Sequence, residues 1–304
     1  MDRIVIVGAG AMGSFFAARL QRAGYAPLLI ARGARLEQVR ASGLVLDEAG
    51  GPHARPVAVA ADASGTGVVD LVLICTKAPD VAAALDALTP AVGPKTALVT
   101  VQNGVETPAH VAARFPGRPV LAGRIHGFFE MEGLRVRHVG VEPSLVYGPL
   151  EAAGDAVARS LSQVLARAGI AHRVAEDIAA ELWEKLVLAS AFGGVGAATG
   201  LAAGPMRNDG VAWALLAEAM HEVAALAMAR GVALDPECAA RMLEFVSGFP
   251  DDATTSLKRD MEAGRPSEYA SLTGAVIRMA SASGLEVPAH RRIEAMIRAR
   301  GLTC

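Results

Sequence analysis

A glycine-rich turn close to the start of the chain constrains the fold more than any other feature. Ile4 to Val7 is a short run of β-branched residues, typical of a strand buried on both faces of a parallel sheet. Gly8, Gly10 and Gly13 follow at once and form the pattern G-x-G-x-x-G, after which the chain has helical character. A strand, a turn of this composition and a helix together predict a binding site for a dinucleotide.

Each glycine has a mechanical role in such a turn. The first permits the tight turn, the second lets the backbone approach a pyrophosphate, and the third lets the helix pack closely on the strand. The open N–H groups at the start of the helix then favour the phosphate charge. The expected cofactor-binding residues of the loop are Gly8, Ala9, Gly10, Ala11, Met12 and Gly13. The alternative is a glycine-rich turn that binds nothing.

The end of the second strand indicates which cofactor is bound. Ala26 to Ala31 has strand character and is followed by Arg32, whereas the first carboxylate comes only at Glu37. An acidic residue at this position would bind a free ribose 2′-hydroxyl, while a cation accommodates a 2′-phosphate. The sequence therefore favours NADP(H) over NAD(H). The alternative is that Arg32 is an ordinary solvated charge.

The first half of the chain alternates between strands and helices. Asp70 to Cys75 and Thr96 to Val101 are apolar strand candidates, followed by Lys77 and by Asn103. Ligands of doubly wound sheets bind at the carboxyl ends of the strands, so Arg32, Lys77 and Asn103 are expected at one edge. Residues 33–56 are expected to form a helix and loop, before a weak strand at 57–61. Residues 119–150 are expected to form short, partly antiparallel strands, followed by a helix at 156–168 and a strand at 171–175.

From residue 177 onward, no convincing strand is found. The apolar residues show helical spacing in Asp177–Phe192, Val211–Arg230, Pro236–Val246, Leu272–Ser283 and Arg291–Arg298. The fold expected is an α/β Rossmann-type domain with a mostly parallel, doubly wound sheet, followed by an all-α domain. We place the NADP-binding domain at residues 1–176 and the helical substrate domain at residues 177–304.

Charge and composition exclude several classes of partner. The chain has 29 basic and 31 acidic residues and no block of like charge, which argues against nucleic acid or an anionic membrane surface. The uncharged run Leu186 to Gly204 is interpreted as a buried helix and turn because it contains five glycines. The chain enters its first strand directly, and its three cysteines form no C-x-x-C pair, which together predict a cytoplasmic protein.

The helical half contains a candidate proton donor. A hydride donor needs a partner that protonates the oxygen it reduces, and Lys185 lies among apolar residues on a predicted helix. The alternative is a lysine whose stem packs on the surface. A second cluster holds Ser256, Asp260 and the segment 264–268, where Ser267 and Glu268 are alternatively a helix cap and a first-turn charge. His126 is expected to be structural, and His221 with Glu222 lacks zinc spacing, so no metal is expected.

These residues together resemble the ketopantoate reductase family along almost the whole chain. The matching pieces are Gly8 to Gly13, Arg32, Lys77, Gln102-Asn103-Gly104, His138-Val139-Gly140, Trp183-Glu184-Lys185-Leu186, Ser256 and Gly264-Arg265-Pro266-Ser267-Glu268. The resemblance implies that Lys185 is the general acid and that Glu268 orients it or holds the substrate hydroxyl. It also implies that Asn103 positions the substrate and nicotinamide, and that Ser256 binds the substrate carboxylate. Arg32 and Lys77 would bind the phosphate and ribose of NADPH.

The chain also departs from the family pattern. Asparagines usually stand four and eight residues after the lysine, where this chain has Ala189 and Gly193, and a third is replaced by Thr273. Losing amides from the pocket wall removes hydrogen-bonding groups and is expected to leave room for a bulkier or more apolar substrate. Ser190 lies off that helix face and is expected to compensate only partly.

The function expected is therefore NADPH-dependent reduction of a 2-keto acid to a 2-hydroxy acid. The substrate is 2-dehydropantoate, a step of pantothenate biosynthesis, or a bulkier 2-keto acid. One alternative is an NADP(H) sensor without turnover, and another is an enzyme resembling 3-hydroxyacid dehydrogenases or imine reductases. The series Gly196, Gly200 and Gly204 permits close helix contact, within the domain or in a homodimer.

Overall fold

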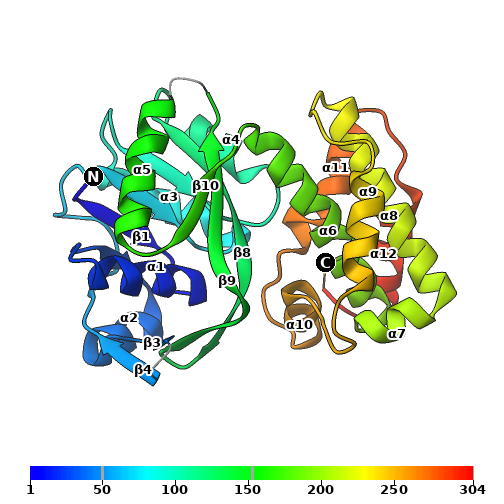
Figure 1. Ribbon diagram of the computed structural model, residues 1–304, viewed down its shortest axis with the longest axis horizontal. Helices are drawn as coiled ribbons and strands as arrows, with labels where there is room; N and C mark the ends of the chain where they lie inside the picture. The colour runs from blue at the N-terminus through cyan, green and yellow to red at the C-terminus, as the bar shows by residue number, and fades with distance from the viewer. Residues whose placement is uncertain (49–50, 152–153, 304) are drawn as a thin grey trace. The chain divides into compact units, whose positions relative to one another are not determined.

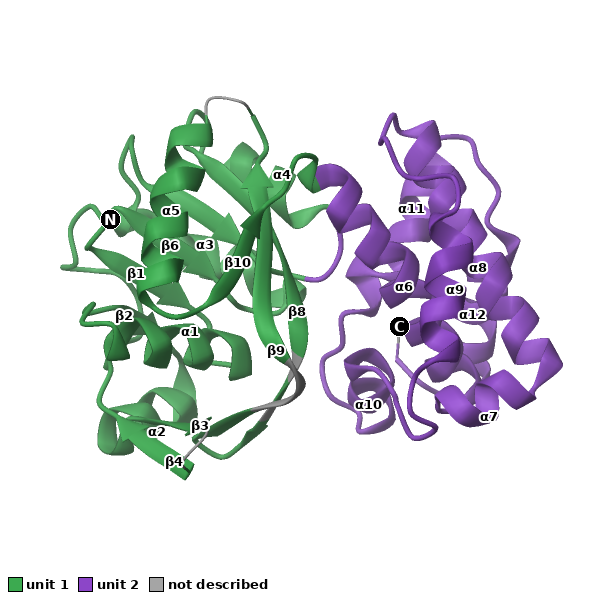
Figure 2. Cartoon of the chain, in the orientation of Figure 1, with its two compact units in different colours: residues 1–102, 106–178 green, residues 103–105, 179–304 purple. Residues whose placement is uncertain are grey.

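The chain forms two compact units, seen here in a computed structural model that describes residues 1–48, 51–151 and 154–303. Unit 1 comprises residues 1–102 and 106–178, and unit 2 comprises residues 103–105 and 179–304 (Figure 2). The side chains of residues 138–141 lie outside the described part, and with them the His138-Val139-Gly140 segment of the family pattern.

Unit 1 is built on one sheet in the order β4-β3-β9-β8-β7-β6-β1-β2-β5, with β10 beside β9. The strands are β1 (Ile4–Val7), β2 (Leu28–Ile30), β3 (Leu44–Glu48), β4 (Gly51–Arg55), β5 (Ala58–Ala60), β6 (Leu71–Ile74), β7 (Ala97–Thr100), β8 (Val120–Glu132), β9 (Arg135–Pro149) and β10 (Ala171–Val174). All pairs from β5 to β8 are parallel, whereas β8–β9 and β3–β4 are antiparallel. This confirms the mostly parallel sheet expected from the sequence.

Helices cover both faces of this sheet (Figure 1). They are α1 (Ala11–Arg22), α2 (Gly33–Ser42), α3 (Val81–Leu88), α4 (Thr107–Arg114) and α5 (Asp155–Arg167). In β1, Ile4 and Ile6 pack with α1, α2 and α5, while Val5 and Val7 pack with α3 and α4. Because side chains alternate between the faces of a strand, a continuous apolar run is what a strand covered on both sides requires.

Two expectations for unit 1 are corrected by the structure. Residues 33–56 are not only helix and loop, because β3 and β4 form a hairpin in which Leu44 and Leu46 are buried. The expected short runs between residues 119 and 150 are two long strands, β8 and β9, with a register shift between His126 and Phe128. Gly127 has a positive φ of 115° at this irregularity, a conformation that glycine adopts without strain.

Unit 2 is helical, and no strand occurs among its described residues. Its helices are α6 (Ile178–Thr199, whose first residue belongs to unit 1), α7 (Ala203–Asn208), α8 (Gly210–Ala229), α9 (Cys238–Ser247), α10 (Ser256–Glu262), α11 (Thr273–Ala282) and α12 (Pro288–Ala299). Helix α8 packs against α7, α9, α11 and α12 around one apolar core. By length and apolar composition α8 could cross a membrane, but half of its apolar window is buried, as in the core helix of a globular protein.

Helix α6 is longer than expected because its glycines allow other helices to approach. A Cβ at Gly194 would lie 2.9 Å from Oγ1 of Thr273 on α11. Cβ atoms at Gly200 and Gly204 would meet the side chains of Arg300 and Asp251. Gly200 and Gly204 therefore approach side chains within unit 2, and the homodimer stays a prediction.

A polar network links α6, α8 and α12 inside unit 2. The carboxylate of Glu222 on α8 accepts hydrogen bonds from the backbone N–H groups of Ala289 (2.6 Å) and His290 (3.0 Å). It also lies 2.7 Å from Nδ1 of His290, whose Nε2 lies 3.4 Å from Oγ of Ser190 on α6. The Ser190 hydroxyl donates to the carbonyl of Leu186 (2.7 Å) and is fully buried. Glu222 thus caps the start of α12.

Candidate functional site

The three glycines of the first turn differ in what surrounds them. Gly8 has a φ of +101°, and a Cβ there would lie 2.6 Å from the backbone nitrogen of Thr76. A Cβ on Gly13 would lie 1.9 Å from the carbonyl oxygen of Gly8, whereas one on Gly10 would meet nothing within 4 Å. The first and third glycines are therefore needed for packing, and the second leaves open space beside the start of α1. This cradle fits the pyrophosphate of a dinucleotide.

Arg35 on α2 holds the glycine-rich loop in place. Its Nε donates to the carbonyl of Ala9 (2.9 Å), its Nη2 to Oγ of Ser14 (3.1 Å) and its Nη1 to the carbonyl of Gly133 (2.7 Å). Burial lowers the pKa of the Arg35 guanidinium. This role was not predicted from the sequence, in which the only sign of it is that Arg35 is a second basic residue three positions after Arg32.

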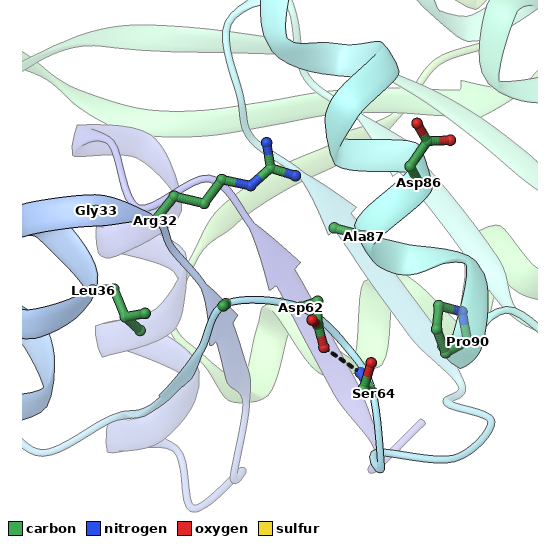
Figure 3. A pocket seen from close by; sticks show the side chains of 9 residues that line it. Arg32, Gly33, Leu36, Asp62, Ser64, Asp86, Ala87 and Pro90 are labelled. Atoms are coloured by element: carbon green, nitrogen blue, oxygen red, sulfur yellow. Dashed lines mark hydrogen bonds between the residues drawn. The ribbon is translucent and has the colours of Figure 1, made fainter.

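Arg32 follows β2 and borders a cavity of about 490 Å³ (Figure 3). The Arg32 side chain is exposed and extends toward α3, where its Nη2 donates to the carbonyl of Ala83 (2.8 Å). Asp62, Ser64 and Asp86 also line the cavity. Hydrogen bonds from Ser64 lower the pKa of Asp62, so this carboxyl group is ionised at neutral pH. The cavity therefore combines one guanidinium with carboxylates and lies beyond the ends of β2 and β5.

Lys77 follows β6 and is exposed at the start of a 3₁₀ turn, Ala78–Asp80. The side chain of Gln102 shapes the preceding segment, because its Nε2 donates to the carbonyls of Ile74 (2.7 Å) and Thr76 (2.9 Å). Arg32 and Lys77 thus both follow parallel strands of unit 1, at the edge where the sequence predicted them.

The structure brings Asn103 and Glu268 together, although they are far apart in the sequence. Nδ2 of Asn103 donates to Oε2 of Glu268 at 2.8 Å, and Glu268 is buried, with 9% of its surface exposed. Gly104 has a φ of +98°, and a Cβ there would lie 2.6 Å from the carbonyl oxygen of Ser271. The segment 103–105 therefore lies against the 3₁₀ turn Tyr269–Ser271, at whose start Glu268 stands. Glu268 does not open a long helix, because α11 begins only at Thr273.

Lys185 lies on α6 beside three buried residues, Leu182, Trp183 and Leu186, and is itself partly buried. Ala189 is one turn further along the same face and is also partly buried. The neighbouring Glu184 pairs with Arg241 on α9 (3.1 Å), which fixes this part of α6 to the helical core.

The positions where the family pattern has asparagines do not all leave space. A Cβ on Gly193 would lie 3.2 Å from Cδ2 of Leu257 and 3.5 Å from Oγ1 of Thr255. The room expected at Gly193 is thus filled by Leu257 of α10, and Ala189 is partly buried and packs against the apolar core of unit 2. Ser190 does not compensate for the missing amides, because its hydroxyl is buried on the side of α6 that faces His290. Thr273 is fully buried as well.

Ser256 is the exposed first residue of α10. Oγ1 of Thr255 caps this helix by accepting from the backbone N–H of Lys258 (3.2 Å). Asp260 is buried and accepts from Nε of Arg265 (3.0 Å), so it stabilises the turn that precedes Glu268. Among the described residues, no group of His, Cys, Asp and Glu side chains could hold a metal ion.

Comparison with known proteins identifies the family of the chain. Residues 4–152 match the family "Ketopantoate reductase PanE/ApbA", and residues 177–301 match its C-terminal family. A 2-dehydropantoate 2-reductase of Mesorhizobium japonicum is 30% identical, with 97% of each chain covered. The 2-dehydropantoate 2-reductase of Mycobacterium tuberculosis is 31% identical, with 94% of this chain and 93% of the relative covered. A solved PanE/ApbA family ketopantoate reductase from Ralstonia eutropha JMP134 is 30% identical, with a TM-score of 0.88 over 98% of this chain and 97% of that chain.

Proposed function

Because the chain belongs to the ketopantoate reductase family, an oxidoreductase family, we propose that it reduces a 2-keto acid to the 2-hydroxy acid with NADPH. The observation that carries this proposal is the hydrogen bond between Asn103 and Glu268, in the unit that also holds Lys185. This hydrogen bond joins Asn103 and Glu268, and the resemblance to the family implies that both residues act at the carbonyl group that is reduced.

The glycine-rich loop supports a nicotinamide dinucleotide as the cofactor. The space beside Gly10 suits the pyrophosphate, and the N–H groups at the start of α1 suit its charge. Arg32 and Lys77 would bind the 2′-phosphate and ribose, and no carboxylate stands at the end of β2 to bind a free 2′-hydroxyl. These features support NADPH over NADH. When bound, the reduced nicotinamide supplies a hydride to the keto carbon.

The residues of unit 2 would manage the proton and the substrate. The ammonium group of Lys185 protonates the keto oxygen as negative charge develops there, and the resulting amine recovers its proton from solvent. Glu268 orients the ammonium group or accepts a substrate hydroxyl, and Asn103 holds Glu268 in place while positioning the substrate. The hydroxyl of Ser256 is available to the substrate carboxylate because it is exposed. The relatives named 2-dehydropantoate 2-reductase make 2-dehydropantoate the first substrate to test.

The test is steady-state kinetics with a panel of 2-keto acids, using NADPH and NADH in parallel. We expect turnover with NADPH at a higher kcat/KM than with NADH. Lys185→Ala should lower kcat by about 10² to 10⁴, the usual contribution of acid catalysis, and leave the Kd of NADPH unchanged. The control is Lys95→Ala, which removes an exposed lysine of unit 1 and should change neither quantity.

Two results would contradict the proposal. If NADPH binds tightly but no 2-keto acid is reduced, the protein is a nucleotide sensor rather than a reductase. If Lys185→Ala turns over at the wild-type rate, Lys185 is not the acid.

A further inference from the structure

The Arg35 side chain uses most of its hydrogen-bonding capacity inside unit 1. A guanidinium group has five N–H donors. In Arg35, Nε donates to the carbonyl of Ala9 (2.9 Å) and Nη1 to the carbonyl of Gly133 (2.7 Å). Nη2 donates to Oγ of Ser14 (3.1 Å) and lies 3.1 Å from Sδ of Met131. Little capacity is left for a ligand, so any effect of Arg35 on binding has to pass through the groups that it holds.

Arg32 differs from Arg35 in this respect. The Arg32 side chain is exposed, and within the described part of the chain its guanidinium makes one hydrogen bond, from Nη2 to the carbonyl of Ala83 (2.8 Å). Its other N–H groups are therefore available to an anion. The two arginines, three residues apart, are equipped for different tasks.

The contact with Arg35 fixes the peptide group between Ala9 and Gly10. The Ala9 carbonyl accepts from Nε of Arg35 and also from the buried hydroxyl of Ser14 (3.3 Å). No cis peptide bond occurs among the described residues, so the C=O of Ala9 and the N–H of Gly10 point in opposite directions. The Gly10 N–H is therefore directed away from the Arg35 side chain.

The N–H group of Gly10 is open to a ligand. Gly10 is exposed, and its N–H has no acceptor in the part of the chain that the structure describes. A Cβ on Gly10 would meet nothing within 4 Å, and α1 begins at the next residue. An N–H group in this position suits a phosphate oxygen. Its direction depends on the Ala9 carbonyl, and hence on Arg35.

We infer that Arg35 is a positioning residue for the cofactor pyrophosphate, because it fixes the Ala9–Gly10 peptide group with the Gly10 N–H directed at the pyrophosphate. This inference rests on the dinucleotide cofactor of the proposed function. It divides the work between the two arginines: Arg32 would bind the 2′-phosphate, which only NADPH has, and Arg35 would serve the pyrophosphate, which NADPH and NADH share. The role needs the forked guanidinium, since a lysine keeps the charge but has a single nitrogen.

The experiment measures the Kd of four ligands for the full chain. ADP has a pyrophosphate without a 2′-phosphate, 2′-AMP has a 2′-phosphate without a pyrophosphate, and NADPH and NADH complete the set. We expect Arg35→Ala to raise the Kd of ADP, NADH and NADPH by a similar factor of about ten, the scale of one hydrogen bond to a charged group. The Kd of 2′-AMP should stay unchanged, whereas general damage to unit 1 would raise it as well.

Two further variants separate geometry from charge and from folding. Arg35→Lys should bind ADP about as weakly as Arg35→Ala, because the charge alone does not orient the peptide group. Ser14→Ala removes the second donor to the Ala9 carbonyl, so it should weaken the same three ligands by a smaller factor. This variant keeps the test valid if Arg35→Ala fails to fold.

Two controls complete the design. Arg40→Ala removes an exposed arginine of the same helix, which pairs with Glu37 (2.7 Å), and should leave all four Kd values unchanged. Arg32→Ala should give the reverse pattern, with weaker binding of NADPH and 2′-AMP and unchanged binding of NADH and ADP.

The inference is overturned if Arg35→Ala binds ADP and NADH as tightly as the wild type, or if it loses 2′-AMP as strongly as ADP. Loss of NADPH and 2′-AMP alone would make Arg35 a ligand of the 2′-phosphate instead. These measurements do not depend on turnover, so a protein that binds NADPH but reduces no 2-keto acid loses the proposed reaction and keeps this inference. A wild-type chain that binds neither dinucleotide would overturn both.

Discussion

The glycines of the first turn all lack a Cβ, but Gly10 and Gly13 should respond differently to substitution by alanine. A methyl group on Gly13 would overlap the carbonyl of Gly8, so Gly13→Ala should lower the free energy of unfolding by about 1–3 kcal/mol, the usual cost of overpacking. A methyl group on Gly10 meets open space, so Gly10→Ala should leave stability unchanged and weaken NADPH binding instead. Urea unfolding and a fluorescence titration with NADPH measure the two effects separately.

The variants Gly13→Ala and Gly10→Ala have to be compared with each other and with a control glycine. Gly33→Ala is a poor control because Gly33 has a positive φ, whereas Gly210 has neither a positive φ nor a nearby atom and lies far along the sequence in unit 2. Gly210→Ala should alter neither NADPH binding nor, to any large extent, unfolding. Tight NADPH binding by Gly10→Ala would mean that the open space is not where the pyrophosphate lies.

At the scale of residues, the sequence predicted what depends on local pattern. The glycine spacing and Arg32 at the end of a strand could be recognised in this way, whereas the roles of Asn103 and Glu268 were implied only by the resemblance to the family. The hydrogen bonds of Arg35 could not be recognised, because Ala9, Ser14 and Gly133 come together only in the folded sheet. The filling of the space at Gly193 by Leu257 was likewise invisible, since α10 lies some sixty residues away in the sequence.

At the scale of elements, Glu222 should hold three helices of unit 2 together. Its carboxylate accepts two backbone N–H groups at the start of α12 and pairs with the fully buried His290. Glu222→Ala would leave these buried donors without an acceptor, so we expect a loss of about 3 kcal/mol in the free energy of unfolding. His221→Ala on the same helix removes an exposed side chain and should cost little. Equal midpoints for both variants in urea would contradict the assigned role.

The elements that the sequence missed share a physical cause. The β3–β4 hairpin joins the sheet through β9, a strand about ninety residues away, and its own run of apolar residues is short. Helix α6 continues through Gly193 and Gly194 because neighbouring side chains approach it closely there, which outweighs the low helix propensity of glycine. In both cases tertiary packing, rather than local preference, determined the structure.

At the scale of the whole molecule, the two units have separate apolar cores. The core of unit 2 consists of residues from its own helices and from the segment 103–105, and the two cores of unit 1 lie on the two faces of its sheet. The sequence predicted this division because strand and helical periodicity change along the chain. The boundary at residue 176 stays a prediction, as does the cytoplasmic location.

Separate cores predict that NADPH stabilises the units unequally. Most of its expected binding residues, among them Gly10, Arg32 and Lys77, belong to unit 1, whereas Asn103 belongs to unit 2. A concentration of 100 times Kd should therefore stabilise mainly unit 1, by about 2.7 kcal/mol. Calorimetry should then resolve two transitions, of which NADPH raises one by roughly 5–10 °C, as expected for a unit of this size. Gly13→Ala should lower the transition that NADPH shifts, and Glu222→Ala should lower the other. A single two-state transition that both variants and NADPH move together would show that the units unfold as one.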